Sequence, residues 1–130
     1  MCIFCSIVKG EIPSQIVYQD ETTMAILDIS QATKGHTLVI PKKHFDNFLD
    51  VDEQTLAHMI TVCQKVGKKL VKNLNADGIN VVNNCNEAAG QAVMHLHIHL
   101  IPRYYGDDYL MKGTAHDYNL DEVLKEINKN

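Results

Sequence analysis

The sequence predicts an α+β fold: a five-stranded antiparallel sheet with one long helix and short helices at the two ends. Short apolar and β-branched runs separated by hairpin-length turns indicate the sheet, because connections that short join antiparallel strands. Apolar residues at helical spacing over several turns indicate the long helix. A chain of 130 residues without repeats or linkers has the length of one domain, spanning residues 1–130.

The five strands are expected where apolar residues alternate between turn signals. They are 16–19, 23–28, 36–40, 79–83 and 93–101. Asp20 and Glu21 are expected to form the turn of the first hairpin. Pro41 and Pro102 are expected to end the third and fifth strands, because proline cannot donate a hydrogen bond to a neighbouring strand.

The long helix is expected to begin near Asp50, which has capping-box spacing to Glu53, and to end at 75–78. Cys63 lies on its apolar face and is interpreted as an inert core thiol. The whole apolar stripe is Leu56, Met59, Ile60, Cys63, Val66, Leu70, Val71 and Leu74.

Two short helices are expected at the ends of the chain. Residues 1–9 should form a helical turn that ends at Gly10. A last helix near 121–128, with a polar tail before it, should bury four apolar side chains, Leu120, Val123, Leu124 and Ile127.

Composition excludes several classes of protein. The formal net charge of −4 lacks the basic balance of a nucleic-acid-binding surface. No apolar run is long enough to span a membrane and no secretion leader is present, so a cytoplasmic protein without a membrane partner is expected. Its four cysteines are then expected to be thiols or metal ligands rather than disulfides.

Residues 93–101 carry the strongest chemical signal. In a strand, His95, His97 and His99 would share one face. The opposite face would place three apolar side chains in the core, Leu96, Ile98 and Leu100. Imidazole serves as nucleophile, acid, base or metal ligand, so the row could have any of these roles. The three rings cannot all be charged, because like charges depress each other's pKa, and a neutral middle ring suits attack on phosphorus.

This run, together with residues 90–92 before it, resembles the signature of the histidine triad (HIT) superfamily of nucleotide hydrolases and transferases. Further matches lie at 12–14, at 35–44 and at the pair Cys2 and Cys5. The resemblance covers about residues 2–103, which would be the core, with a C-terminal tail and short helix over 104–130. It is closest to the bacterial Hint-like branch. It implies the HIT fold and a homodimer in which two sheets join into one.

The resemblance also implies catalytic roles. His97 would be the nucleophile that takes up the nucleotidyl group, giving an intermediate that water opens. His99 would contact the phosphate and the leaving group. His36 matches the fourth histidine that supports the triad, although a histidine that merely opens a strand is the competing interpretation. Ala92 stands where Hint relatives commonly have serine, so a donor to amine leaving groups is missing.

Substrate contacts are implied at three further positions. Asp28 would bind the ribose hydroxyls, although a solvated aspartate at a strand end is an alternative. Gln91 would lie near the phosphate. An asparagine should also contact the phosphate, and Asn84 is favoured over Asn83.

Cys2 and Cys5 have the spacing by which two thiolates hold one Zn²⁺, and such a site usually needs two more ligands. A redox pair is the alternative, but no thioredoxin-like βαβ pattern surrounds the motif. Related bacterial proteins imply His44 and His95 as the other ligands. The expectation is one structural zinc per chain, with none required for the chemical step.

The function expected from the resemblance is hydrolysis or transfer of purine nucleoside phosphoramidates or related nucleoside monophosphate conjugates through a nucleotidyl-histidine. A dinucleoside polyphosphate hydrolase of the Fhit type keeps the mechanism and changes the substrate. A nucleotide-binding regulatory protein with incidental hydrolysis is a third candidate. A metal-dependent hydrolase would commonly need an acidic ligand within the motif, and none occurs between His95 and Arg103.

Overall fold

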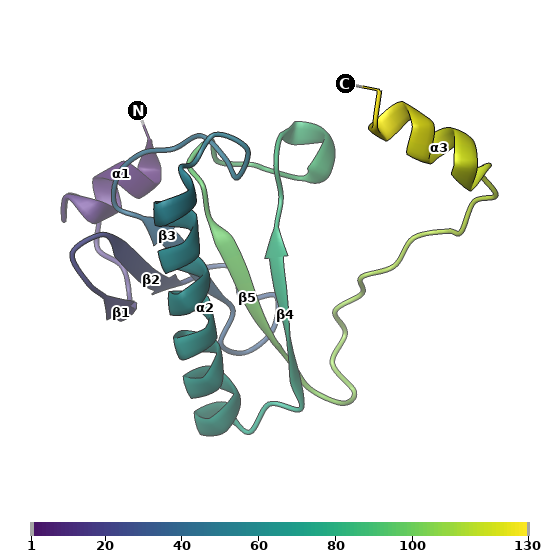
Figure 1. Ribbon diagram of the computed structural model, residues 1–130. Helices are drawn as coiled ribbons and strands as arrows, with labels where there is room; N and C mark the ends of the chain where they lie inside the picture. The colour runs from purple at the N-terminus through teal and green to yellow at the C-terminus, as the bar shows by residue number, and fades with distance from the viewer. Residues whose placement is uncertain (1, 130) are drawn as a thin grey trace.

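The computed structural model describes residues 2–129 and shows helix α2 lying across one face of a sheet (Figure 1). The strands are β1 (Ile16–Gln19), β2 (Thr23–Leu27), β3 (Thr37–Pro41), β4 (Gly78–Asn83) and β5 (Ile98–Arg103). Their order in the sheet is β1-β2-β3-β5-β4, and each neighbouring pair is antiparallel. The predicted five-stranded antiparallel sheet is confirmed.

The helices are α1 (Ile3–Val8), α2 (Glu53–Leu74), the 3₁₀ turn η1 (Glu87–Ala89) and α3 (Leu120–Ile127). They match the predicted set of one long helix and two short terminal ones. Residue 1, which the predicted N-terminal turn included, and residue 130 lie outside the described residues. No described helix is both long and apolar enough to cross a membrane.

Helix α2 begins later than predicted. Its N-cap is Asp52, whose carboxylate accepts a hydrogen bond from the Thr55 N–H at 2.9 Å. Asp50 instead accepts from the backbone N–H groups of Asp46 and Asn47, in the loop before the helix. The predicted capping box at Asp50 is therefore wrong, because the local turn takes that carboxylate and a second aspartate two residues on caps the helix.

The main core lies between α2 and the sheet. It contains Ala25, Val39, Met59, Val62, Cys63, Val66, Leu70, Leu96, Ile98 and Leu100. Each Val, Leu, Ile or Met side chain among them contributes about 1.5–3 kcal/mol of burial free energy. Burial raises the pKa of the Cys63 thiol to about 12, which agrees with the inert core thiol predicted for it.

The strand predicted over 93–101 begins later, at Ile98. The chain before it is not paired in the sheet, and the Leu96 N–H donates to the Phe45 carbonyl at 2.7 Å. Alternation nevertheless continues, since Leu96 is as fully buried as Leu100. The histidine row therefore spans the entry to a strand as well as the strand itself.

The prediction that proline ends a strand is confirmed for Pro41 but wrong for Pro102. Pro102 pairs with Ile79, and β5 continues to Arg103. Pro41 is the last residue of β3 and pairs with Thr23. Proline fits such positions where its nitrogen faces no acceptor on the adjacent strand.

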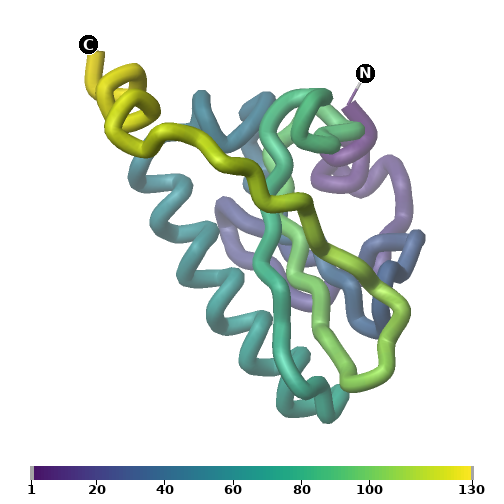
Figure 2. The backbone as a smooth tube through the Cα atoms, turned by 90° about the vertical axis from the view of Figure 1, so that its right-hand side faces the viewer, coloured from purple at the N-terminus to yellow at the C-terminus, as the bar shows by residue number. Residues whose placement is uncertain are grey.

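Beyond β5 the chain runs as an arm that ends in α3. The arm lies outside the β4 edge in Figure 1 and passes in front of β4 in Figure 2, which views the molecule from that side. The prediction that α3 buries its apolar face is wrong for the single chain, because the arm holds the helix away from the core. The exposed fractions are 78% for Leu120, 37% for Val123, 58% for Leu124 and 72% for Ile127.

Candidate active site and metal centre

Four histidines follow one another from the entry of β5 to the start of β3. The ring centroids of His97 and His99 are 5.1 Å apart, and those of His36 and His99 are 5.2 Å apart. The contact with His36 arises because Leu38 of β3 is the register partner of His99. His95 precedes these rings and belongs to a second cluster. The sequence-predicted row thus divides into two sites.

The His97 ring is held with one nitrogen free. Its Nδ1 lies 2.7 Å from the His95 carbonyl oxygen, which can only accept a hydrogen bond. Nδ1 therefore carries the hydrogen, and Nε2 keeps an unprotonated lone pair. His97 is only 7% exposed, so little water competes for that lone pair.

His99 is held as a neutral ring. Burial, together with the neighbouring His97 and His36, lowers its pKa to about 4, while Asp28 acts in the opposite direction. Its Nδ1 lies 2.9 Å from Nε2 of His36. A neutral imidazole here can donate or accept a hydrogen bond without adding charge to the row.

A cavity of about 340 Å³ opens beside His97 and His99, within the range of small-molecule sites. It has an apolar part made by α1, the connector after it and β2, and a polar part where the histidines lie. The lining residues are Ile3, Phe4, Ile7, Ile12, Pro13, Ser14, Ile26, Leu27, Asp28, Ile29, Leu38, Asn84, Gly90, Ala92, Val93, His97 and His99. The wall made by α1 is a feature that the sequence motifs did not reveal.

The predicted substrate contacts do not all lie in this cavity. Asp28 and Asn84 line it. Asn83 instead donates from Nδ2 to the His97 carbonyl at 2.9 Å, so it supports the histidine segment from behind. Asp28 accepts from the Ser30 N–H at 2.8 Å through Oδ1, which fixes the orientation of its carboxylate.

The side chain of Gln91 supports the loop before the histidine row, and its expected contact with the phosphate stays a prediction. Its side chain is buried, with Nε2 donating to the carbonyls of Asp46 and Val93 and Oε1 accepting from the Asn86 N–H. Among residues 2–129 it is not part of the cavity wall. Its amide therefore shapes the loop that carries Gly90 and Ala92 into the wall, rather than facing the cavity itself.

The second cluster joins the N-terminus to the histidine row. Cys2 Sγ and Cys5 Sγ lie 3.3 and 3.5 Å from His95 Nδ1, and Cys5 Sγ lies 3.3 Å from His44 Nδ1. All four ligand atoms are within 4.8 Å of one another. A tetrahedral zinc ion with ordinary bond lengths requires S–N separations of about 3.5 Å. The distances therefore fit zinc.

The outer ring nitrogens of this cluster also fit a metal. His95 Nε2 donates to the Pro41 carbonyl at 2.9 Å, and His44 Nε2 donates to Asp46 Oδ1 at 2.9 Å. Both Nδ1 atoms are therefore free of hydrogen and face the thiols. Desolvation lowers the pKa of His95, which keeps its lone pair available at neutral pH.

The Cys2 thiol is also prepared for ligation. Desolvation acts to raise its pKa, but hydrogen bonds outweigh it, chiefly that from the Cys5 backbone N–H at 3.4 Å, so the net pKa is lowered. A lower pKa favours the thiolate, which is the form that binds metal. The four residues can hold a zinc ion that ties α1 to the sheet.

A second group of metal-type side chains, Asp28, His36 and His99, is also close together. Its outer nitrogen does not fit. His36 Nδ1 lies 3.2 Å from the Ala32 backbone N–H, which can only donate, so the ring hydrogen must be on Nε2. Nε2 is the atom that would have to face the metal, and this group therefore suits hydrogen bonding rather than metal binding.

Comparisons with known proteins agree with this fold. The family model described as HIT domain matches residues 9–106. An uncharacterized HIT-like protein of Methanocaldococcus jannaschii is 49% identical over 128 residues, which are 98% of each chain. A crystal structure of a Streptococcus mutans protein, 45% identical, superimposes with a TM-score of 0.94 over 98% of this chain and 83% of that one. A zinc-bound histidine triad family protein from Mycobacterium smegmatis is 40% identical, with a TM-score of 0.81 over 88% of this chain and 84% of that one.

Proposed function

The chain belongs to the HIT domain family, whose superfamily contains nucleotide-binding proteins and hydrolases, and from that premise we propose that it is a nucleotidyl hydrolase or transferase. Its substrates would be purine nucleoside phosphoramidates or related nucleoside monophosphate conjugates. One observation supports this most: His97 lines the cavity with its Nδ1 hydrogen committed to the His95 carbonyl and its Nε2 lone pair free.

The proposed reaction has two steps. His97 Nε2 attacks the phosphorus, forming a P–N bond as the bond to the leaving group breaks, and the leaving group departs with that electron pair and takes up a proton. Water then attacks the same phosphorus and gives up a proton, the P–N bond breaks, and the nucleoside monophosphate is released with His97 restored. His99 would stabilise the phosphoryl or leaving-group oxygen or nitrogen by a hydrogen bond.

The cavity offers matching sites for the other parts of a nucleotide. The Asp28 carboxylate, fixed by the Ser30 N–H, can accept from ribose hydroxyls. Asn84 lines the same cavity as His97 and His99, and its amide would contact the phosphate. The apolar part, with Ile7 and Ile26, can cover the faces of a purine ring.

The test is mass spectrometry of the protein after brief mixing with an adenosine or guanosine phosphoramidate and an acid-free quench. A nucleoside monophosphate adduct on His97 is the expected result. An adduct on another residue would refute the mechanism. So would turnover that EDTA abolishes and that gives no adduct at all. A parallel panel with dinucleoside polyphosphates decides between the two substrate classes.

We also propose that Cys2, Cys5, His44 and His95 hold one structural zinc ion per chain. The ligand distances and the orientation of both outer nitrogens support it, as does the zinc-bound relative from Mycobacterium smegmatis. The ion would lie outside the chemical step, because none of its four ligands is among the residues that line the cavity. Metal analysis of untagged protein should give one zinc per chain, and substoichiometric metal after purification without chelators would refute this.

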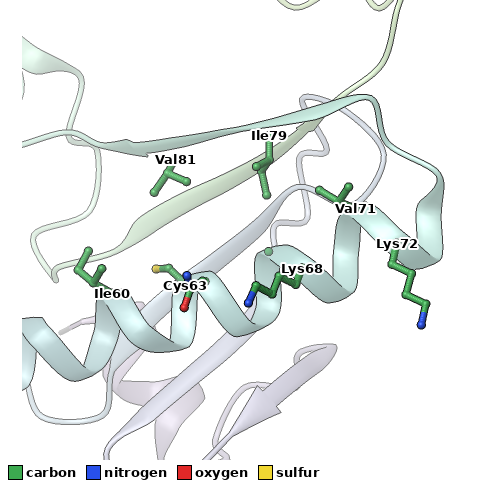
Figure 3. Close-up of a pocket in the computed structure, with 9 residues that line it drawn as sticks. Ile60, Cys63, Lys68, Val71, Lys72, Ile79 and Val81 are labelled. Carbon is green, nitrogen blue, oxygen red and sulfur yellow. The ribbon is translucent and has the colours of Figure 1, made fainter.

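The proposed assembly is a homodimer that continues the sheet through β4. Within residues 2–129, β4 has a neighbour on one side only, so its outer edge offers unpaired backbone groups. Beside it lies a largely apolar groove between β4 and α2 (Figure 3), in which Ile60 is 48% and Val81 57% exposed. A second copy would cover both edge and groove.

Sedimentation equilibrium at micromolar concentration tests this assembly. The wild type should be a dimer, and Val81→Glu should shift it toward a monomer because a charge enters the joined surface. Leu49→Glu is the matched control, since Leu49 is 74% exposed on the loop before α2. A wild type that sediments as a single chain of 14.6 kDa would refute the dimer.

A further inference from the structure

The loop between β2 and β3 is closed by one amide side chain, that of Gln31. Its Nε2 donates to the carbonyl oxygens of Asp28 and His36, and its Oε1 accepts from the Gly35 N–H at 2.8 Å. Asp28 and His36 are the first and last residues of the loop, so the amide joins its two ends from inside. Gln31 is part of neither the histidine motif, nor the lining of the cavity beside His97, nor the cluster of metal-type ligands.

The closed loop directs one backbone donor at a ring of the histidine row. The Ala32 N–H points at His36 Nδ1, at 3.2 Å. Ala32 directly follows Gln31, and the His36 N–H donates to the Thr33 carbonyl at 3.1 Å, so the ring and its donor are fixed in the same short turn. His36 is only 6% exposed, which leaves water little access to compete.

That donor favours one set of hydrogen positions on two rings, and the Asp28 carboxylate, whose Oδ2 lies 3.6 Å from His36 Nε2, favours the same set. Because His36 Nδ1 accepts, His36 Nε2 carries the hydrogen and donates it to His99 Nδ1 at 2.9 Å. His99 Nδ1 then also accepts, so His99 is a donor at Nε2. In the opposite tautomer, His36 Nδ1–H would face the Ala32 N–H, and a buried donor would lose its partner.

We propose that Gln31 is a positioning residue: by closing the loop it holds the Ala32 N–H on His36 and thereby makes His99 a hydrogen-bond donor toward the leaving atom. The part of this proposal that concerns the leaving atom rests on the proposed function. The part that concerns the tautomers depends only on the ring contacts and the loop. Gln31 acts through His36 and touches no reacting atom.

The tautomers can be measured without substrate by ¹⁵N NMR of protein labelled at its histidine rings. In the wild type, the Nδ1 atoms of His36 and His99 should both have the chemical shift of an unprotonated acceptor, whereas His97 should have the reverse pattern. Gln31→Met keeps the length of the side chain and removes all three hydrogen bonds. It should move the His36 and His99 signals toward a mixture of tautomers and leave those of His97 in place.

Ser30→Ala is the matched control, because it lies in the same loop and retains the backbone N–H that Asp28 accepts. Its ring signals should equal those of the wild type. Unchanged His36 and His99 signals in a folded Gln31→Met variant would overturn the proposal. A wild type in which His36 Nδ1 is protonated would overturn it even if the variant does not fold.

The effect of Gln31 on catalysis can be measured by comparing kcat for substrates with two different leaving groups. A poor amine leaving group needs the His99 donor, whereas a nitrophenolate departs readily without it. For a nucleoside phosphoramidate, which has an amine leaving group, Gln31→Met should lower kcat about tenfold or more. For the nitrophenyl ester of the same nucleoside monophosphate, kcat should fall less than about threefold. Equal losses for both substrates would indicate a merely structural role and overturn the proposal. If no nucleotidyl-His97 forms at all, the proposed function fails while the ring signals still test the tautomers.

Discussion

The proposed zinc cluster (Cys2, Cys5, His44 and His95) and the proposed catalytic row (His97, His99 and His36) use the histidine side chain in opposite ways. His44 and His95 turn their outer nitrogens to oxygen atoms, those of Asp46 and Pro41, and so present bare Nδ1 atoms to the thiols. His36 turns its outer nitrogen to an N–H group and so presents a hydrogen to His99. The group that each outer nitrogen meets, rather than the histidine itself, decides between ligand and donor.

His97 lies between the two clusters, and its ring is oriented like those of His44 and His95. Its outer nitrogen meets a carbonyl oxygen at 2.7 Å, so its inner nitrogen is bare like those of the ligands. It faces a cavity instead of thiols, which makes it a candidate nucleophile rather than a ligand. Only two positions along the chain thus separate the proposed zinc ligand His95 from the proposed nucleophile His97.

The largest expected effect is that of His97→Asn. The change retains polar bulk but removes the nucleophilic nitrogen, so turnover should fall by about three orders of magnitude or more. Nucleotide affinity and zinc content should stay near those of the wild type, because the Asp28 part of the cavity and the metal cluster are unchanged. Steady-state kinetics, nucleotide titration and metal analysis check the three expectations.

His99→Asn sharpens the comparison because it removes a donor and leaves the covalent route. Its loss of turnover should be smaller, about 10²-fold. Near-normal turnover in His97→Asn combined with abolished turnover in His99→Asn would reverse the roles assigned to the two rings.

On the metal side, Cys5→Ser should act mainly on stability. A zinc ion held by Cys2, Cys5, His44 and His95 would tie α1 to the sheet, and α1 also forms one wall of the cavity. The variant should lose zinc and lower Tm by about 10 °C or more, and KM should rise more than kcat falls. Calorimetry, metal analysis and kinetics test this. A variant that keeps its Tm, or loses only kcat, would contradict the separation of the two sites.

Much of this arrangement could be predicted from sequence, since alternation and spacing report faces and ligands. The row, the C-x-x-C pair and the five strands depend on local periodicity. What alternation could not report was that the chain enters β5 only at Ile98, because a backbone hydrogen bond to a distant residue, Phe45, replaces strand pairing at Leu96. The histidines still alternate there.

Gln91 shows that a resemblance in sequence does not give the hydrogen-bond partners of a side chain. An amide beside the row could face the phosphate or the loop, and only the positions of the Asp46 and Val93 carbonyls decide between them. The role proposed for Gln31 had no sequence signal either, because its three partners are backbone groups, which every residue possesses. The face of α3 was misassigned because its burial depends on the course of the arm.

Acid should lower the stability of the folded protein through His99. The folded pKa of His99 is about 4, below the ordinary value of 6.5, so between these pH values the unfolded chain binds more protons. Stability therefore rises with pH through that window and is lost as pH falls from about 6.5 to 4, by at most about 3 kcal/mol. Urea unfolding at pH 7 and 5 checks this. His99→Asn should show a smaller loss than the wild type, and the zinc ligands, which also protonate, are common to both proteins.

The smallest effect is expected from Asp46→Ala, which tests the rule on which the comparison depends. Asp46 accepts the His44 Nε2 hydrogen at 2.9 Å and so helps to keep Nδ1 bare, and it contributes to a raised pKa of His44. Loss of such an outer partner can weaken metal binding 10–100-fold at buried sites. Here the side chains of His44 and Asp46 are 40% and 64% exposed, so water can replace the carboxylate and the loss should be about tenfold or less. Competition with a chromogenic chelator measures it, and Glu53→Ala, an acid in the first turn of α2, serves as the control. Zinc affinity unchanged in Asp46→Ala would mean that the orientation of His44 comes from the backbone alone, and the rule would then hold only for buried rings such as His95.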